Sequence, residues 1–309
     1  MKSKKDVVVL GHTGFLGNAL HMRLLSLGFN SIGLSKSTGF DLRIPGSLDE
    51  ILAELKPSTI INCAALVGGI EFGRSRPAEI YSENLRMTLS ILESASKHGV
   101  RLVNPISNCA YPSRLQVFSE DMFWDGPLDE SVLEYGGVRK FAWVGARAYE
   151  KQFGLDSINL VFPNMYGPGD HLDPVRAHAL GALVFKFCVA KAEKSPSVLV
   201  WGSGAPVREW MYIDDAVDAL ILAISAENVG SELINIGTGL GISIKELASE
   251  IGRQVGFDGD TLFDLSMPDG APHKTMDGTK GHQVLNWKPK TDLPVGIKHT
   301  IRWYQSQMN

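Results

Sequence analysis

The sequence is poor in cysteine, with three in 309 residues. Cys63, Cys109 and Cys188 lie far apart and show no paired or metal-type spacing. This argues against a disulfide framework and against a zinc site. We therefore expect no bound metal, and any role of a cysteine must be individual.

An excess of charge of one sign is also missing. The formal net charge is -4, which gives no support for a nucleic-acid or anionic-membrane partner. No apolar run approaches a membrane span, and VVVL at 7–10 is shorter than the ~7–15 residues of a signal-peptide core. These absences predict a cytoplasmic protein with a small-molecule substrate.

Short apolar runs alternate with longer helical stretches up to about residue 163. The runs are VVVL, SIGL, TIINCAA, RLVNPIS and INLVFP. This alternation is typical of parallel strands joined by helices. It predicts an α/β fold with a doubly wound, parallel Rossmann sheet.

The pattern changes after Pro163, where Gly/Pro-rich loops such as PNMYGPGD and SMPDGAPHKTMDG appear, with a predicted helix near 175–193. The segments MYIDDAVDALILAI and ELINIG indicate a return to the sheet. We therefore predict a sheet domain over 1–163 plus about 211–238. A smaller, discontinuous substrate-binding lobe is predicted over about 164–210 and 239–309.

A glycine pattern follows the first apolar run. VVVLGHTGFLG places Gly11, Gly14 and Gly17 after a predicted strand and at the start of a predicted helix. Such a loop brings backbone N–H groups against a pyrophosphate. The context favours dinucleotide binding over a plain tight turn.

The end of the second predicted strand indicates which dinucleotide binds. An NAD-type site carries an acidic residue there, whereas this chain has Ser35, Lys36 and Ser37. Hydroxyls and a cation suit a 2′-phosphate, which a carboxylate would repel. We predict NADP(H), with Asp41 facing the adenine; the alternative is that Lys36 is only a solvated surface lysine.

Two nucleophile-type side chains stand at the end of the fourth predicted strand. If the chain stays extended, Ser107 and Cys109 project to one side and Asn108 points away. Open α/β sheets place their ligands at the carboxyl ends of strands, so both residues are candidates for the site. The alternative is a buried serine and a small hydrophobic cysteine.

Tyr135 opens a predicted helix that runs to about Phe153. Arg139 follows four residues later and shares its face, whereas Lys140 is turned about 140° away. A cation beside a phenol lowers its pKa from about 10 and lets it exchange a proton near neutral pH. Tyr135 and Arg139 are therefore candidate catalytic residues.

Together these motifs resemble the extended short-chain dehydrogenase/reductases, which combine a Gly-x-x-Gly-x-x-Gly start, a serine at the fourth strand's end and a Tyr-x-x-x-Lys helix. The resemblance narrows to the GDP-L-fucose synthases, which epimerise and reduce a 4-keto-6-deoxy sugar nucleotide. The match covers nearly the whole chain in order. Its segments are VGGI at 67–70, SNCAYP at 107–112, PNMYGPGD at 163–170, AHALGAL at 177–183, VWGSGAPVREWMYIDD at 200–215 and PDGAPHK at 268–274.

The resemblance implies a role for each catalytic candidate. Ser107 and Tyr135 would hold and protonate the C4 ketone oxygen of the sugar. Cys109 and His178 would be the acid/base pair of epimerisation. The alternative for His178 is a satisfied helix histidine.

The resemblance also implies two sets of binding residues. Beyond the residues named above, the cofactor set contains Phe15, Leu16, Ala64, Ala65, Arg139, Pro163, Asn164 and His178. The substrate set contains Val67, Gly68, Asn164, Lys186, Trp201, Arg208 and Lys274. Taken singly, Trp201 as a core aromatic and Arg208 in a surface salt bridge are the alternatives.

Arg139 is the chief departure from the family, which has lysine there. Arginine keeps the charge, but its planar fork is larger, and the usual bond to the nicotinamide ribose need not form. Three hypotheses stay open: an NADPH-dependent epimerase-reductase of a GDP-4-keto-6-deoxy sugar, an isomerase or reductase of a related GDP sugar with part of that activity, and a nucleotide-binding protein without turnover. The family further implies a homodimer through the helices near 75–98 and 133–153.

Overall fold

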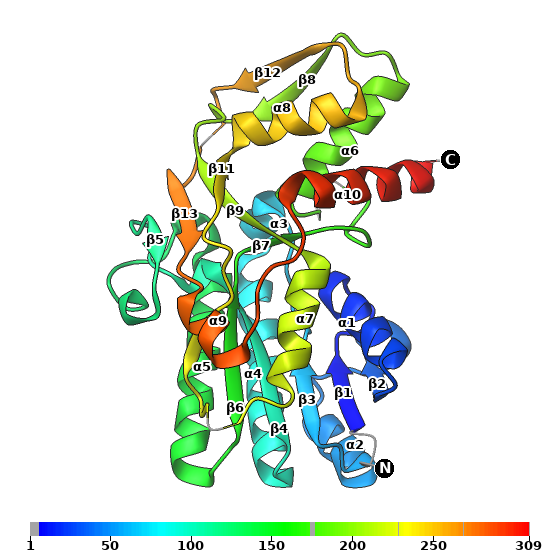
Figure 1. Ribbon diagram of the computed structural model, residues 1–309. Helices are drawn as coiled ribbons and strands as arrows, with labels where there is room; N and C mark the ends of the chain where they lie inside the picture. The colour runs from blue at the N-terminus through cyan, green and yellow to red at the C-terminus, as the bar shows by residue number, and fades with distance from the viewer. Residues whose placement is uncertain (1–5, 174–176, 228, 268, 309) are drawn as a thin grey trace.

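The computed structural model describes residues 6–173, 177–227, 229–267 and 269–308. Its largest feature is a six-stranded parallel sheet in the order β10-β6-β4-β3-β1-β2 (Figure 1). The order reverses at β1, which has β2 on one side and β3 on the other. The doubly wound α/β sheet predicted from the sequence is therefore confirmed. Its strands are β1 (Asp6–Leu10), β2 (Asn30–Leu34), β3 (Thr59–Asn62), β4 (Arg101–Ser107), β6 (Ser157–Phe162) and β10 (Leu233–Asn235).

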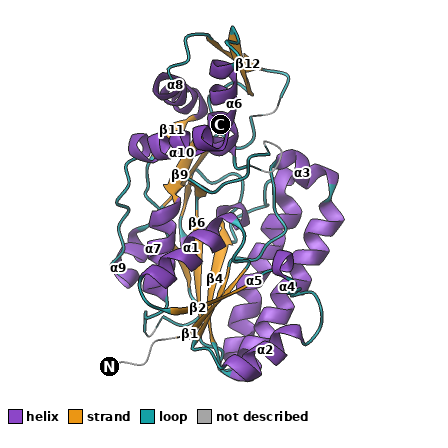
Figure 2. Cartoon of the chain, turned by 90° about the vertical axis from the view of Figure 1, so that its right-hand side faces the viewer, coloured by secondary structure: helices purple, strands orange, loops and turns teal. Residues whose placement is uncertain are grey.

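Helices cover both faces of this sheet because its central strands are apolar on both sides. In β1, Val7 and Val9 join one buried cluster and Val8 and Leu10 join another, as the two-residue period of a strand requires. Figure 2 shows α4 and α5 on the side of the strands opposite α7. The first cluster includes side chains of α1 (Phe15–Ser26) and α7 (Ile213–Ala223), and the second those of α2 (Ser47–Leu55), α4 (Pro77–His98) and α5 (Leu133–Phe153).

Short helices occupy several connections. The helix α3 (Ile70–Ser75) leads into α4, and α9 (Thr279–Leu285) lies against β10. Single 3-10 turns are formed by Lys36–Thr38, Asn108–Ala110, Glu120–Met122 and Glu130–Val132. The second of these turns directly follows β4 and shapes the site described below.

A smaller group of elements lies above the large sheet in the view of Figure 1. Three helices, α6 (Ala179–Ala192), α8 (Ile244–Val255) and α10 (Leu293–Met308), pack around a buried cluster that includes Phe187, Leu247 and Tyr304. One small sheet has the order β11-β9-β13-β5 with β7 beside β9, and β8 pairs with β12. These strands are β5 (Val117–Phe118), β7 (Asn164–Tyr166), β8 (Ser197–Trp201), β9 (Val207–Tyr212), β11 (Gly241–Ser243), β12 (Asp260–Asp264) and β13 (His273–Met276).

A buried carboxylate ties this smaller group together. Glu209 on β9 is fully buried and accepts hydrogen bonds from the backbone N–H and hydroxyl of Thr238 and from the N–H of Met276, at 2.7 Å for the last. Burial raises the pKa of Glu209, and these hydrogen bonds oppose the rise. The carboxylate therefore fixes β9, β13 and the turn at Thr238 relative to one another.

Some boundaries differ from the sequence prediction. The helix expected near 175–193 begins at Ala179, and residues 174–176 lie outside the described part. The helix expected to open at Tyr135 begins two residues earlier, at Leu133. Within the described residues, no helix combines the length and the apolar character that crossing a membrane would need.

Candidate active site

The glycine loop after β1 is built on close backbone contacts. Gly11 has a φ of +76°, and a Cβ at Gly17 would lie 2.2 Å from the Gly11 carbonyl oxygen. Larger residues at these positions would push α1 away from the loop. The loop therefore delivers the start of α1, with Phe15 and Leu16 in its first turn, to the carboxyl end of β1. A helix N-terminus in that position suits a pyrophosphate.

Three hydroxyls gather at the end of β2. The Thr13 Oγ1 lies 2.6 Å from the Ser35 Oγ and 2.7 Å from the Ser37 Oγ, with Lys36 between the two serines in sequence. A cluster of hydroxyls beside an ammonium, without a carboxylate among them, has the chemistry to hold a phosphate monoester. Thr13 was not foreseen from the sequence, because its partners are 22 and 24 residues away.

Asp41 lies close to this cluster but is engaged in an ion pair. The Arg43 guanidinium binds both Asp41 and Glu83. Hydrogen bonding from Arg43 lowers the pKa of Asp41 to about 2. Asp41 is thus a charged hydrogen-bond acceptor whose orientation is fixed by Arg43, near the hydroxyl cluster.

The strand β4 does not continue in extended form past Ser107. Residues 108–110 turn into a 3-10 helix, and the Ser107 Oγ accepts a hydrogen bond from the Cys109 N–H at 3.2 Å. The prediction based on strand alternation is therefore wrong in its geometry, although both side chains are only partly buried. Asn108 is buried. The hydroxyl and the thiol stand on one tight turn at the carboxyl end of the sheet.

A glycine brings the tyrosine helix against this turn. A Cβ at Gly136 would lie 2.4 Å from the Cys109 carbonyl oxygen, so only glycine allows the observed approach of α5. Tyr135 precedes Gly136 and is partly exposed. The close approach thus places the backbone of Tyr135 one residue from the contact with the Ser107–Cys109 turn.

Arg139 links Tyr135 to the end of β3. Its guanidinium carbon lies 5.1 Å from the centre of the Tyr135 ring, and its Nη2 donates to the Ala64 carbonyl at 3.3 Å. The residue is buried, and its Nε has no hydrogen-bond partner among the described residues. Arg139 therefore lies beside the phenol and has an Nε–H group without a hydrogen-bond partner among the described residues. Ala64 and Ala65 form the adjoining backbone.

Lys140 faces elsewhere. Its ammonium donates to the Phe123 carbonyl and lies 4.7 Å from the Phe123 ring centre and 4.3 Å from that of Trp124. Burial lowers the pKa of Lys140. It is held in an aromatic box and does not replace Arg139 beside Tyr135, in agreement with the helical geometry.

His178 lies just before the first turn of α6, near the end of the glycine loop. Its ring centre is 5.6 Å from that of Phe15, and its Nδ1 is 3.0 Å from the Oδ1 of the buried Asp170. Pro163 connects β6 to β7, whose first residue is Asn164, and the Asn164 Nδ2 donates to the Glu209 carbonyl at 3.3 Å. Asp170 was not foreseen, because it lies eight residues before His178 and the two meet only in the folded chain.

Two cations occupy neighbouring strands of the small sheet. Arg208 on β9 and Lys274 on β13 are paired in register. Arg208 donates to the carbonyls of Val207 at 2.8 Å and Asp269 at 3.4 Å, and the Lys274 Nζ lies 3.7 Å from an Asp129 oxygen. Burial lowers the pKa of Arg208, while the charges of Asp129, Asp269 and Cys109 act in the opposite direction.

Asp129 joins the two cations, because it lies beside Lys274 and its charge acts on Arg208. Asp129 was not foreseen from the sequence; it caps the turn before α5 and holds Lys274.

Lys186 and Trp201 form a separate pair on α6 and β8. The Lys186 Nζ donates to the Leu199 carbonyl at 3.2 Å and lies 5.5 Å from the Trp201 ring centre. Trp201 is 53% exposed, so it is not a core aromatic. Val67 and Gly68 lie in the loop between β3 and α3, where Gly68 packs against Phe72.

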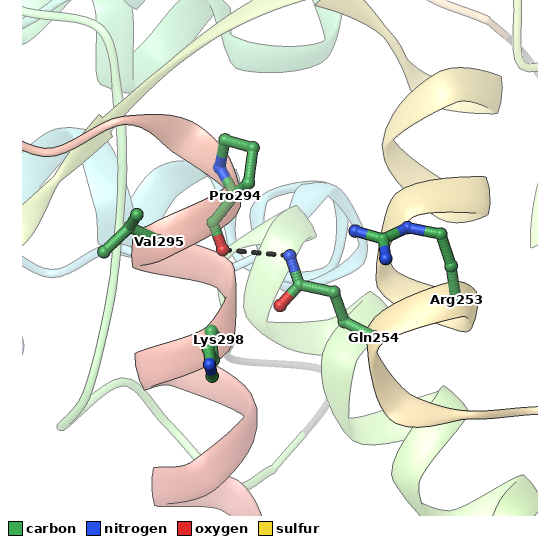
Figure 3. Close-up of a pocket in the computed structure, with 5 residues that line it drawn as sticks. All are labelled: Arg253, Gln254, Pro294, Val295 and Lys298. Carbon is green, nitrogen blue, oxygen red and sulfur yellow. Dashed lines mark hydrogen bonds between the residues drawn. The ribbon is translucent and has the colours of Figure 1, made fainter.

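A pocket of about 350 Å³ between α8 and α10 contains none of these residues. It is lined by Arg253, Gln254, Pro294, Val295 and Lys298, and the Gln254 side chain donates to the Pro294 carbonyl at 2.9 Å (Figure 3). The glycine loop, Ala64 with its partner Arg139, and the Ser107–Cys109 turn instead follow the carboxyl ends of β1, β3 and β4. We therefore treat that edge of the large sheet as the candidate active site.

Comparison with known proteins identifies the family of the chain. Residues 7–237 match the NAD dependent epimerase/dehydratase family. Probable GDP-L-fucose synthase 1 of Oryza sativa subsp. japonica is 37% identical over 302 residues, covering 96% of this chain and 91% of the rice protein. GDP-L-fucose synthase of Escherichia coli (strain K12) is 32% identical, covering 98% of this chain and 97% of its own.

A solved structure is similar over the whole chain. The GDP-mannoheptose C4 reductase from Campylobacter jejuni with NADP bound superposes with a TM-score of 0.88 at 28% identity and covers 99% of each chain. These similarities confirm the resemblance predicted from the motifs. The chain belongs to the NAD dependent epimerase/dehydratase family of extended short-chain dehydrogenase/reductases, among the relatives of the GDP-L-fucose synthases.

Proposed function

We propose that this chain is an NADPH-dependent epimerase-reductase of a GDP-4-keto-6-deoxy sugar, which inverts C3 and C5 and reduces the C4 ketone. The observation that carries the proposal is the contact of Gly136 with the Cys109 carbonyl. It sets the tyrosine helix against the turn that carries a hydroxyl and a thiol. The relatives that span almost the whole chain are named as GDP-L-fucose synthases, which supports the substrate class.

The residues present fit NADP(H). The glycine loop from Gly11 through Gly14 to Gly17, with Phe15 and Leu16, would hold the pyrophosphate at the start of α1. Ser35, Lys36 and Thr13 would hold the 2′-phosphate, with Asp41 at the adenine. The nicotinamide end would meet Ala64, Ala65, Arg139, Pro163, Asn164 and His178. When bound, NADPH supplies the hydride for C4.

The substrate would lie between this cofactor site and the smaller group of elements. Arg208 and Lys274 would bind its diphosphate, together with Lys186 and the exposed Trp201. Val67, Gly68 and Asn164 would contact the sugar. We accordingly propose a cofactor domain over 1–163 and about 211–238, and a substrate lobe over the remainder.

The same two hydroxyl groups would bind the C4 oxygen of the sugar in every step of the reaction. The C4 ketone acidifies the C–H bonds at C3 and C5, so Cys109 and His178 can remove a proton on one face and return one on the other. Ser107 and Tyr135 would stabilise the oxygen of each enolate by hydrogen bonds. During reduction Tyr135 would give its proton to the C4 oxygen, aided by the positive charge of Arg139 at its ring.

Two further features belong to the proposal. Large apolar side chains remain exposed on α4 and α5, among them Tyr81, Leu89 and Phe141, and they support a homodimer through these helices. We also propose that the enzyme works in the cytoplasm.

A second candidate rests on Arg139. Its guanidinium already bonds to the Ala64 carbonyl, where a shorter ammonium would be freer to reach a ribose hydroxyl. An enzyme that keeps only the isomerase or only the reductase activity on a related GDP sugar is therefore the alternative. A protein without turnover is disfavoured, because a plain nucleotide binder has no need of the thiol and of the imidazole set on Asp170.

Deuterium incorporation separates these candidates. We expect incubation with GDP-4-keto-6-deoxymannose in deuterated water to put deuterium at C3 and C5, with NADPH consumed when it is present. Deuterium without NADPH oxidation would favour the isomerase, oxidation without deuterium the reductase, and cofactor binding alone a protein without turnover. Cys109→Ser should abolish the incorporated deuterium and leave NADPH affinity intact; unchanged exchange would refute its role.

A further inference from the structure

Asp170 is a buried carboxylate next to the imidazole that the proposed function requires. Its side chain is 1% exposed, against 36% for that of His178. The Oδ1 accepts from the His171 N–H at 2.8 Å and lies 3.0 Å from the His178 Nδ1. The Oδ2 accepts from the His178 N–H at 3.1 Å. One carboxylate thus holds both the backbone and the ring of the same histidine.

This arrangement sets the tautomer of the imidazole. An ionised carboxylate can only accept hydrogen bonds, so the His178 Nδ1 must carry a hydrogen. The Nε2 is then the nitrogen that accepts or donates the proton exchanged with substrate. The ring also lies beside that of Phe15, the first residue of α1, with the ring centres 5.6 Å apart.

The surroundings fix Asp170 in turn. A Cβ at Gly181 would lie 2.7 Å from the Asp170 Oδ2 and 2.7 Å from the Tyr304 hydroxyl, so α6 and α10 close around the carboxylate. The Tyr304 hydroxyl donates to the His171 carbonyl at 3.0 Å. Burial and the charge of Asp170 raise the pKa of Tyr304, so this phenol stays neutral. The N-terminus of α6 adds partial positive charge.

We propose that Asp170 is a positioning residue for epimerisation: it holds His178 as the Nδ1–H tautomer and directs the Nε2 to C3 or C5 of the sugar. The inference rests on the proposed function, which it deepens. The simpler role, an acceptor for the backbone N–H groups of His171 and His178, accounts for two of these hydrogen bonds. It does not account for the contact between the Asp170 Oδ1 and the His178 Nδ1, and this contact determines that the ring hydrogen is on Nδ1.

The test combines Asp170→Asn with a matched control, Tyr304→Phe, which removes a hydroxyl from the same place but leaves the Asp170–His178 contact. In Asp170→Asn we expect deuterium incorporation at one of the two carbons to fall by about 100-fold or more, the contribution of a correctly protonated acid/base group. NADPH affinity should stay unchanged. The control should keep wild-type exchange within about threefold.

The tautomer gives a readout that a purely structural role would not move. In long-range ¹H–¹⁵N spectra of histidine-labelled protein, wild-type His178 should be the Nδ1–H form, and Asp170→Asn should shift it towards Nε2–H. Asp170→Glu, which keeps a carboxylate, should restore part of the exchange.

Each possible result either supports or refutes the proposed role of Asp170. Wild-type spectra with His178 as Nε2–H would overturn the inference even if no variant folds. Normal exchange in a folded Asp170→Asn would make Asp170 an acceptor for backbone N–H groups only and leave the proposed function standing. Absence of exchange in the wild type would instead refute the proposed function, while its spectra would still show whether Asp170 sets the tautomer.

Discussion

Replacing Gly136 by alanine tests the contact on which the active site is built. The added methyl would lie 2.4 Å from the Cys109 carbonyl oxygen and 3.1 Å from its carbonyl carbon, so α5 or the Ser107–Cys109 turn must yield by about 1 Å. Alanine gains about 1 kcal/mol of helix propensity over glycine, while overpacking costs roughly 1–3 kcal/mol. We expect a small net loss of stability. A displacement of ~1 Å at reacting groups can cost about 100-fold in rate, so activity should suffer far more than folding.

Gly137→Ala is the matched control. It lies one residue further along α5, and apart from its chain neighbours and the adjoining backbone of α5, no atom of the described residues comes within 4 Å of the methyl it would add. We expect it to raise the melting temperature by about 2 °C and to leave deuterium exchange and NADPH oxidation unchanged. If Gly136→Ala melted like this control and kept exchange within about threefold, the close approach of helix and turn would not constrain catalysis.

Three further predictions follow from the electrostatics. Arg139→Lys keeps the charge beside Tyr135 in a more compact group, so the turnover of NADPH should stay equal or rise; complete loss would show a dedicated role for the guanidinium. Ser37→Asp puts a carboxylate in the hydroxyl cluster, and like charges at ~4 Å cost at least about 1 kcal/mol. Fluorescence titration should therefore show NADPH affinity at least about fivefold weaker relative to NADH, and an unchanged ratio would contradict the placement of the 2′-phosphate. Because Arg43 lowers the pKa of Asp41 from 3.8 to about 2, the stability that this pair contributes is complete above pH ~4 and lost as pH falls through about 2. In acid melting curves Asp41→Asn should remove this dependence, and a wild-type slope would contradict it.

The large sheet could be predicted from the sequence because its strands are buried on both faces. VVVL reads as an uninterrupted apolar run, and Val7 to Leu10 are fully buried in two opposite clusters. The period of α5 likewise separated Arg139 from Lys140 correctly. Both inferences depend on local geometry, which the order of residues alone determines.

The details of the site depend on contacts between distant segments and could not be predicted in the same way. The turn after β4 forms because the Ser107 hydroxyl accepts from the Cys109 N–H, a competition with the extended chain that alternation does not reveal. Thr13 meets Ser35 only when β1 and β2 lie side by side. Asp170 reaches His178 across a loop, so its role appears only with coordinates.

The register of β9 with β13 has a consequence for how sugar nucleotides are admitted. Arg208 and Lys274 are direct partners across the two strands, and the Glu209 carboxylate of β9 accepts hydrogen bonds from Thr238 and from Met276 of β13. The register fixes the backbone positions of the two cations, so the proposed binding of a diphosphate would need little rearrangement of the backbone that carries them.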